Sequence, residues 1–241
     1  GFNALVEKLK DSIISHDGKI YTSQPISSIN YLESKQSVVL KKNGKDEFFD
    51  AALLTVPSNV ASSILKDSIS QDSKYLNTLM GTKYLDAAVI VFVSDQKISN
   101  YYWHNINDDS EFVVFLSLTN LIGTDSFKGK HVYYIGDYMT SHSENMHIDK
   151  EMLMKKWFNQ LKLFFPHFDE SLVLEKHLFR FKNAQHIVDI GYEEKIPSMI
   201  TPCKNVFLSN FSQIFPMDRG TNYAIGEGIK ASELIASKLS N

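Results

Sequence analysis

The stretch NVFLSNFSQIFPMDRGTNYAIGEG, residues 205–228, joins a strand-like apolar run, a charged turn and the start of a helix. A strand that leads through a loop into a helix N-terminus presents unpaired backbone N–H groups and the positive end of the helix dipole. This arrangement favours an anion, and Arg219 adds a fixed cation with a planar fork. Thr221 and Asn222 can cap the helix. An ordinary charged turn before a capped helix explains the same residues, so the local pattern leaves both interpretations open.

The residues on the N-terminal side of the chain predict a helix, a hairpin and a buried strand. Apolar residues recur at helical spacing through residues 2–14, and one or two short strands are expected in residues 19–33. Asn43-Gly44 lies between SVVLKK and DEFFDAALLTV, which predicts a hairpin with a type I′ turn. The continuous apolar run AALLTV, residues 51–56, is typical of a central or parallel strand that is buried on both faces. A helix is expected to follow it.

The middle of the chain is rich in predicted strands. Residues 82–140 contain four apolar or aromatic runs separated by polar loops, which favours antiparallel meander pairing. Helical spacing returns at residues 149–165, with Asp149 as the expected N-cap. A strand at 172–181, a loop at 182–204, a strand at 205–211 and a last helix complete the chain. The fold class is therefore α+β, with mixed α/β features and an antiparallel or mixed sheet in the middle.

Composition and charge exclude several classes of protein. The chain has 241 residues, 43% of them hydrophobic, and a net charge of -3, with no long basic block for nucleic acid. No apolar run approaches the roughly 20 residues of a membrane span. The single cysteine, Cys203, excludes an internal disulfide and fits a cytoplasmic protein. Because the chain starts at Gly1 without an initiating Met or a signal peptide, we expect it to begin partway through a larger protein.

Four segments give the chain a family resemblance. GFNALVEKLKDSI…GKIYTSQPISSI, DAALLTVPS, NAQHIVDIGY and NVFLSNFSQIFPMDRGTNYAIGEGIKASELIA occur in the order found in the FAD-dependent amine oxidase and protoporphyrinogen oxidase superfamily, which the chain resembles. It is most similar to the bacterial branch of protoporphyrinogen-oxidase-like and UDP-galactopyranose-mutase-like proteins. The likeness covers nearly the whole chain, but only the C-terminal part of such a protein.

The resemblance implies a division of the chain and a set of cofactor-binding residues. Residues 1–58 and 205–241 correspond to parts of an FAD-binding domain of Rossmann type, and residues 59–204 correspond to a substrate domain whose sheet roofs the flavin. The implied FAD-binding residues are Ile26, Thr55, Pro57, Asp218, Arg219, Gly220, Thr221, Asn222, Tyr223 and Ala224.

The sequence departs from the family pattern at one place. Such flavoproteins begin with a strand, a G-x-G-x-x-G turn and a helix that hold the pyrophosphate of FAD. No such motif occurs in this chain, and Gly226-Glu227-Gly228 lacks the preceding strand and the third glycine. The N-terminal Rossmann half is therefore expected to be missing. We predict that the chain alone binds FAD weakly or not at all.

The resemblance implies a small-molecule substrate but assigns no catalytic residue. Its implied substrate-binding residues are Gln185, His186, Tyr138 and Tyr192. A metal site is not expected, because His142 and His147 stand five residues apart in a polar loop without further ligands. No G-x-S-x-G elbow for a hydrolase is present.

Three functions follow from these observations. The first is flavin-mediated oxidation of a small molecule, and the second is a redox-neutral nucleotide-sugar mutase reaction. The third is a non-catalytic binding module. The two arginines of the chain, Arg180 and Arg219, are few for a mutase that must bind a sugar diphosphate.

Overall fold

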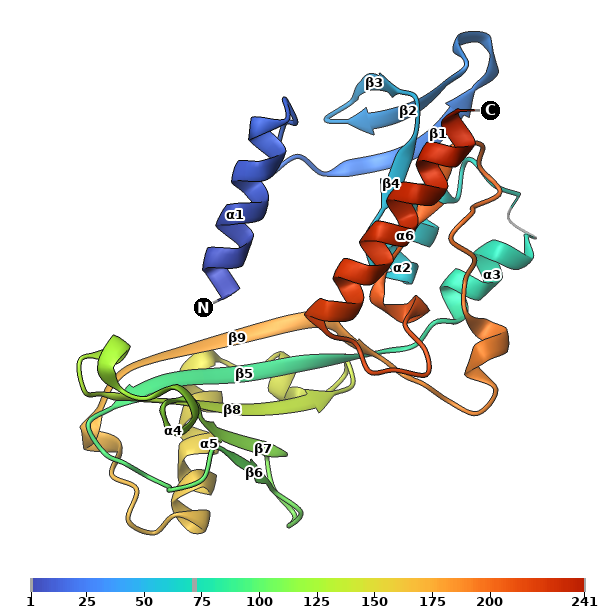
Figure 1. Ribbon diagram of the computed structural model, residues 1–241. Helices are drawn as coiled ribbons and strands as arrows, with labels where there is room; N and C mark the ends of the chain where they lie inside the picture. Colours follow the sequence, from blue (N-terminus) through green and yellow to red (C-terminus); the bar gives the residue numbers. More distant parts are fainter. Residues whose placement is uncertain (1, 71–72, 241) are drawn as a thin grey trace. The chain divides into compact units, whose positions relative to one another are not determined.

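The computed structural model describes residues 2–70 and 73–240 and divides the chain into two compact units. One unit combines Gly1–Gly81 with Glu193–Asn241 and is called the split unit below. The other unit is the continuous segment Thr82–Tyr192 and is called the inserted unit. Figure 1 shows the elements of both in sequence colours, and each unit is described by itself.

The split unit contains two small sheets and several helices. Its helices and strands are α1 (Phe2–Ser15), β1 (Ile26–Leu32), β2 (Ser37–Lys42), β3 (Lys45–Phe49), β4 (Ala52–Leu54), α2 (Ser58–Leu65), α3 (Lys74–Gly81), β10 (Val206–Leu208) and α6 (Thr221–Leu239). Short 3-10 helices are η1 (Glu33–Lys35) and η6 (Phe211–Gln213), and η5 (Tyr192–Lys195) begins on the last residue of the inserted unit.

The first sheet of the split unit is the antiparallel meander β1-β2-β3. The tight turn between β2 and β3 consists of Asn43 at φ 50° and Gly44 at φ 77°. Because asparagine and glycine tolerate positive φ better than other residues, this dipeptide closes the hairpin and sets Lys42 opposite Lys45. The hairpin predicted from Asn-Gly is confirmed.

The second sheet of the split unit pairs β4 with β10 in parallel, although 154 residues separate Ala52 from Val206 in the numbering. Leu54, Val206 and Leu208 are buried in the core of the unit, where they join apolar residues of β1, β2, α2 and α3. Leu53 points to the other side and is 37% exposed. The parallel strand predicted at residues 51–56 is confirmed, but it is shorter than expected and is not buried on both faces.

The helices of the split unit differ in how much of their surface they bury. α2 begins after Pro57 and buries Ala61, Ile64 and Leu65, and α3, which the sequence pattern did not predict, buries Leu76 and Leu79. By contrast, α1 buries no described side chain, and α6 buries only Ala231. Both helices are amphipathic, and because they bury so few side chains, their apolar faces remain exposed.

The inserted unit is one five-stranded sheet, and α5 packs against one side of it. Its helices and strands are β5 (Tyr84–Ser94), β6 (Trp103–Asn105), β7 (Val114–Ser117), α4 (Leu118–Ile122), β8 (His131–Met139), α5 (Lys150–Phe164) and β9 (Val173–His186), with short 3-10 helices η2 (Asp125–Phe127), η3 (Glu144–Met146) and η4 (Glu170–Leu172). The strand order is β6-β7-β8-β5-β9, and all pairings are antiparallel.

The strand order differs from the simple antiparallel meander that the sequence predicted. β6, β7 and β8 do follow one another, but β5 lies between β8 and β9. β9 also continues to His186, so residues 182–186 belong to a strand and not to the loop that the sequence predicted. The reason is the pairing of Leu85 with Gln185, which extends the ladder past a bulge.

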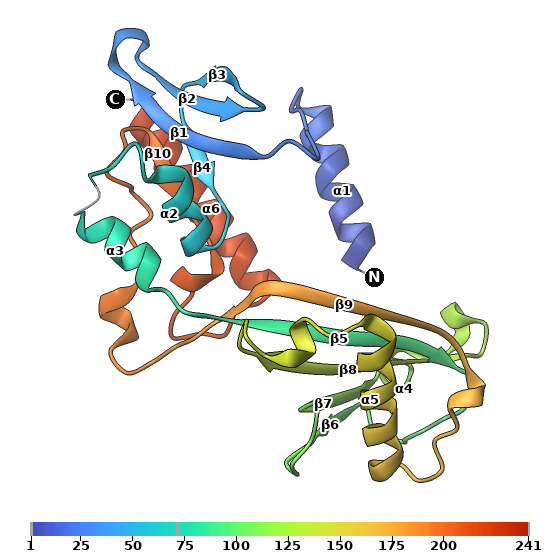
Figure 2. The ribbon, with the colours of Figure 1, turned by 180° about the vertical axis from the view of Figure 1, so that it is seen from behind.

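The core of the inserted unit lies between the sheet and α5 (Figure 2). Asp149 caps α5 as predicted, because its carboxylate accepts the backbone N–H groups of Glu151 at 2.8 Å and Met152 at 3.2 Å. Trp157 is fully buried, together with a set of rings from the sheet and the loops. The other aromatic members of this cluster are Phe92, Phe112, Phe115, Tyr133, Phe158 and Phe168.

Candidate functional site

The split unit brings two chain segments together at the carboxyl ends of its parallel strands. β4 runs into Thr55 and then into α2, and β10 runs into Ser209, the η6 turn and finally α6. The Ser209 N–H donates to the Leu54 carbonyl at 2.9 Å, so the two strand ends are held side by side. In parallel α/β sheets, ligands bind outside the carboxyl ends of the strands.

A hollow of about 280 Å³ lies at these strand ends. It is lined by both strand ends and by the first turns of α6, and two of the predicted FAD-binding residues, Thr55 and Ala224, belong to it. The full lining is Leu53, Thr55, Ser209, Asn210, Phe211, Ile214, Ala224, Glu227 and Gly228. The wall is largely apolar, with a few polar groups that could orient a ligand.

A buried polar network fixes the geometry of this hollow. The Asn210 side chain accepts hydrogen bonds from the backbone N–H of Ser212 at 3.0 Å and from its hydroxyl at 2.6 Å, and it donates to the Val56 carbonyl at 2.9 Å. The hydroxyls of Ser58 and Ser212 lie 3.0 Å apart. All three side chains are buried, so each bond replaces one that water would otherwise supply. The network therefore ties the loop after β4 to the loop after β10.

The N-terminus of α6 is closed by backbone and not by a side chain. Gly220 is the N-cap, in an extended conformation with φ −166°, and no side-chain cap hydrogen bond is formed. Thr221 and Asn222, which the sequence offered as caps, instead lie in the first turn. A Cβ atom on Gly220 would lie 2.7 Å from Oδ1 of Asn222, so the glycine permits this approach. The N–H groups in the first turn of a helix are donors that can bind an anion.

The other predicted FAD-binding residues do not line the hollow. The backbone N–H of Arg219 donates to the carboxylate of Asp218 at 2.8 Å in the turn before α6. Pro57 is the N-cap of α2, and Ile26 is the first residue of β1. Two residues before Ile26, the side-chain oxygen of Gln24 is buried without a hydrogen-bond partner in the described part of the chain. Such an atom marks a place where an additional donor would fit.

The inserted unit brings two of the four predicted substrate-binding residues onto one face of its sheet. Tyr138 pairs with Ala87 and Gln185 pairs with Leu85, two neighbouring positions on the same face of β5. His186 pairs with Tyr84, so it lies on the opposite face, where it is buried. Tyr192, also buried, stacks against the His186 ring with 5.4 Å between ring centroids.

A wide bulge in β9 places Gln185 on this face. Residues 182–184 stand opposite the single residue Asp86, and Asn183 adopts φ 53°. The Asp86 carboxylate, itself buried, accepts the Asn183 N–H at 2.9 Å and so holds the bulge. Bulges re-aim side chains next to functional sites. The sequence signal was an asparagine in a strand-forming stretch, since asparagine tolerates the left-handed region.

Arg180 has a structural role in the inserted unit. Its Nε donates to the Asn145 carbonyl at 3.0 Å, and its Nη2 donates to the Ile148 carbonyl at 2.7 Å. These bonds hold the segment that precedes α5. The arginine is therefore engaged by backbone and lies on the α5 side of the sheet, opposite to Tyr138.

Neither a metal site nor a membrane span is found in the described residues. No group of three or more His, Cys, Asp or Glu side chains is placed to hold an ion there. His147 donates from Nε2 to the Ser141 carbonyl at 2.7 Å within its own turn. Across residues 2–70 and 73–240, every helix is too short or too polar to cross a bilayer.

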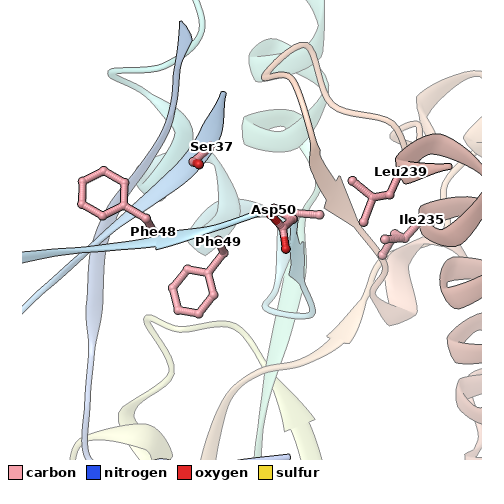
Figure 3. A pocket seen from close by; sticks show the side chains of 7 residues that line it. Ser37, Phe48, Phe49, Asp50, Ile235 and Leu239 are labelled. Carbon is pink, nitrogen blue, oxygen red and sulfur yellow. The ribbon is translucent and has the colours of Figure 1, made fainter. Parts of the chain in front are cut away.

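A larger hollow of about 460 Å³ lies at the C-terminal end of α6 (Figure 3). Phe48 and Phe49 contribute to it from β3, and Ile235 and Leu239 contribute from α6, with Asp50 between the two pairs. None of the predicted FAD-binding residues lines this hollow. It is therefore separate from the site at the strand ends.

Solved structures share the fold of the chain. A protein described as "Putative protoporphyrinogen oxidase" from Exiguobacterium sp. 255-15 matches with a TM-score of 0.78 and 15% identity over 100% of this chain and 51% of its own. An oxidoreductase from Methanosarcina mazei matches with 0.64 and 14%, over 87% of this chain and 49% of its own. A reduced UDP-galactopyranose mutase matches with 0.57 and 13%, over 76% and 39%. The chain thus spans about half the length, or less, of these structures.

The fold defines a class of proteins in which a unit built from two separate chain segments is combined with an inserted sheet unit. The sequence model of the flavin-containing amine oxidoreductases matches residues 1–233, so the chain belongs to that family. No curated protein matches the sequence closely enough to narrow this further. The resemblance and the fold class expected from the sequence are both confirmed.

Proposed function

We propose that the chain is the C-terminal part of an FAD-dependent oxidoreductase of the amine oxidase type that oxidises a small molecule. In this proposal the split unit holds one side of FAD, and the inserted unit binds the substrate. The observation that carries it is the hollow at the carboxyl ends of β4 and β10, next to the first turns of α6. Family membership supplies the cofactor class, because flavin-containing amine oxidoreductases are flavoproteins.

The residues at the hollow fit part of a dinucleotide. The first-turn N–H groups of α6 suit the negative charge of a pyrophosphate, and Gly220, the N-cap of the helix, adds no side chain of its own there. Thr55 and Asn210 offer polar groups at an otherwise apolar wall. A volume of about 280 Å³ is at the lower limit for ligand sites. In this proposal, a second protein surface therefore contacts the rest of the cofactor. When bound, the flavin would supply the acceptor for a hydride or electrons, while the protein orients it.

In our proposal, that second surface is a G-x-G-x-x-G half, for which the uncovered length of the matched structures leaves room. The chain covers 51% of the longer protein from Exiguobacterium, and it contains no G-x-G-x-x-G motif of its own. The half can belong to the same polypeptide or to a second one. Without it, the pyrophosphate loses the glycine-rich turn, and we expect FAD binding to be weak or undetectable.

Arg180 argues against the mutase alternative. A sugar diphosphate needs cations that are available to its phosphates, and Arg180 donates to two backbone carbonyls instead. Arg219 is the other arginine of the chain, and it lies in the turn before α6, in the cofactor site. A non-catalytic binding module remains the alternative if no flavin is bound.

The first test is the visible absorption of the complete gene product that contains this chain, purified as it is made. Bands near about 375 and 450 nm, which belong to the flavin itself, are expected. Their absence after reconstitution with FAD would reject the oxidoreductase and favour the binding module.

A second test uses two glycines. Gly220→Val should weaken FAD retention about tenfold, because the new side chain displaces Asn222 from the first turn of α6. Gly81→Val is the control, since no heavy atom lies within 4 Å of a Cβ at that position. The melting temperature of the FAD-free protein provides a readout independent of activity. Equal FAD retention in both variants would remove the α6 turn from the site.

A further inference from the structure

The face of the inserted sheet that is turned away from α5 is an exposed aromatic surface. The strand pairings put every second residue of each strand on this face, alongside Ala87 and Val89 of β5. We call it the aromatic face. Its large side chains are Trp103, Leu116, Tyr134, Tyr138, Phe179 and Phe181.

Four rings of the aromatic face are about half exposed. The exposed fractions are 52% for Trp103, 47% for Tyr138, 46% for Phe179 and 50% for Phe181. Phe179 and Phe181 stack along β9, with 6.3 Å between ring centroids. A contiguous exposed apolar patch of this kind is uncommon on a protein that has no ligand or partner for it.

Small residues lie between the large ones in the middle of the face. Along one row of the sheet, Ala87 lies between Tyr138 on β8 and Phe181 on β9. In the next row, Gly136 and Val89 precede Phe179. Two strand spacings separate β8 from β9, so Tyr138 and Phe181 stand about 10 Å apart. That width accepts one flat ring system between two rings.

The face carries almost no charge. Outside the bulge at residues 182–184, the single charged residue among the described strand residues of this face is the carboxylate of Glu175, near the start of β9. It is already paired with the ring of His177 at 2.6 Å. Asp137 and Arg180 both pair with Ala88, so they lie on the α5 side. A charged group placed on the centre of the aromatic face would meet no counter-charge.

We propose that the aromatic face binds the substrate, and that the part of the substrate it contacts is uncharged, apolar and flat. This inference rests on the proposed function in so far as it calls the ligand a substrate. The binding of a ligand to the aromatic face itself needs no flavin. Stacking on exposed rings stabilises such a ligand, and the small residues of β5 and β8 leave room for it. Gln185 and Asn105, at the edges of the face, are the polar groups that could orient it.

The test uses the two tryptophans of the chain, because one lies on each side of the same sheet. Trp103 is on the aromatic face, and Trp157 is fully buried behind it. Their indole N–H signals are followed by ¹H–¹⁵N NMR in the full chain without flavin and are assigned with Trp103→Phe. The probes are 1-naphthylmethanol, 1-naphthoate and 1-naphthylmethylammonium, which share one ring system and differ in charge.

The expected result is a saturable shift of the Trp103 signal with the neutral probe and no shift of the Trp157 signal. Both charged probes should bind at least about tenfold more weakly, because the face supplies no counter-charge. Phe179→Ser should weaken neutral-probe binding about tenfold. Leu163→Ser is the control, since Leu163 is 72% exposed on α5, on the other side of the sheet.

Three outcomes would overturn the proposal. They are a Trp103 signal that does not respond, a charged probe that binds as well as the neutral one, and equal effects of Phe179→Ser and Leu163→Ser. Sedimentation of the same samples adds a fourth: a dimer that Phe179→Ser dissociates would assign the face to a second copy of the chain. If the probe binds as expected but the complete gene product lacks flavin bands, the ligand-binding role of the aromatic face is supported and the proposed oxidoreductase function is rejected.

Discussion

The inserted unit and the split unit differ in how fully they bury their own apolar side chains. The inserted unit packs α5 against its sheet, with Trp157 and Leu161 fully buried. In the split unit, α1 buries no described side chain, and the 19 residues of α6 bury only Ala231. The parallel pair β4–β10 has three residues in each strand. Parallel sheets are normally covered on both faces, whereas Leu53 of this pair is 37% exposed.

The two units therefore differ in the packing of their helices, because α5 is packed against its own sheet whereas α1 and α6 leave apolar faces exposed. On the α5 side of its sheet, the inserted unit buries one continuous cluster of apolar side chains and rings. The split unit has a tight core around β1, β2, α2 and α3, but leaves the faces of its first and last helices exposed. This asymmetry agrees with the proposal that a nucleotide-binding half completes the split unit.

The largest effect is expected in the core of the inserted unit. Trp157→Ala should lower the free energy of unfolding by about 3–5 kcal/mol, because it leaves a cavity among Phe92, Phe112 and Phe158. Urea unfolding followed by circular dichroism measures it. Met152→Ala, on the exposed side of the same helix, should change the value by less than about 0.5 kcal/mol. Equal losses in both variants would mean that this core is not the source of stability.

A smaller loss is expected at the strand ends of the split unit. Asn210→Ala removes the partner of the buried Ser212 hydroxyl and of the Val56 carbonyl, which should cost about 2 kcal/mol. Asn77→Ala, an exposed change on α3, is the control and should be nearly neutral. Thermal unfolding compares the two. A neutral Asn210→Ala would show that the network does not hold the loops together.

A pH-dependent effect is expected at Asp137. Burial, and to a lesser extent the nearby Glu111, raises the pKa of its carboxyl above the ordinary value. A raised pKa means that the folded state disfavours the charged form, so the penalty is absent below the ordinary pKa of about 4. It grows as the pH rises from the ordinary pKa to the raised one and is constant above that.

Asp137→Asn should therefore stabilise the chain at neutral pH, by less than about 1 kcal/mol because solvent screens this half-exposed group, and should make no difference at low pH. Melting temperatures across this pH range measure it, with the exposed Asp109→Asn as control. A gain at low pH that vanishes at neutral pH would contradict the assigned cause.

The smallest effect is expected on the exposed face of α6. Ile229 is 55% exposed, so Ile229→Ser should cost less than about 0.5 kcal/mol in this chain. The same change at Leu161 of α5, which is fully buried, should cost several times more. Unfolding of both variants in urea gives the comparison. If Ile229→Ser costs as much free energy of unfolding as Leu161→Ser, α6 is packed in this chain. The conclusion that the apolar face of α6 is exposed would then be wrong.

Much of the local structure could be predicted from the sequence. Helical spacing gave α1, α5 and α6 within one or two residues, the Asn43-Gly44 pair gave its hairpin, and Asp149 gave the start of α5. These features depend on residues close together in the chain, so the pattern contains the cause. The family could also be recognised, because its segments recur in order along the chain.

The candidate sites could be predicted only in part. Thr55 and Ala224 do line one hollow, although no local pattern relates them. Asn210, Ser58 and Ser212 were missed, because serine and asparagine in loops carry no signal that they will be buried together. Tyr138 and Gln185 share a face that His186 does not, and a bulge decides that.

By itself, the sequence determined α1, α5, α6, the β2–β3 hairpin and the family to which the chain belongs. Tertiary structure alone decided that β4 pairs with β10, that β5 runs between β8 and β9, and that an uncharged aromatic face results. The physical reason is the distance along the chain over which each interaction acts. Capping, turn conformation and helical periodicity act over a few residues, whereas strand pairing and burial join residues far apart and depend on the free energy of the whole packed unit.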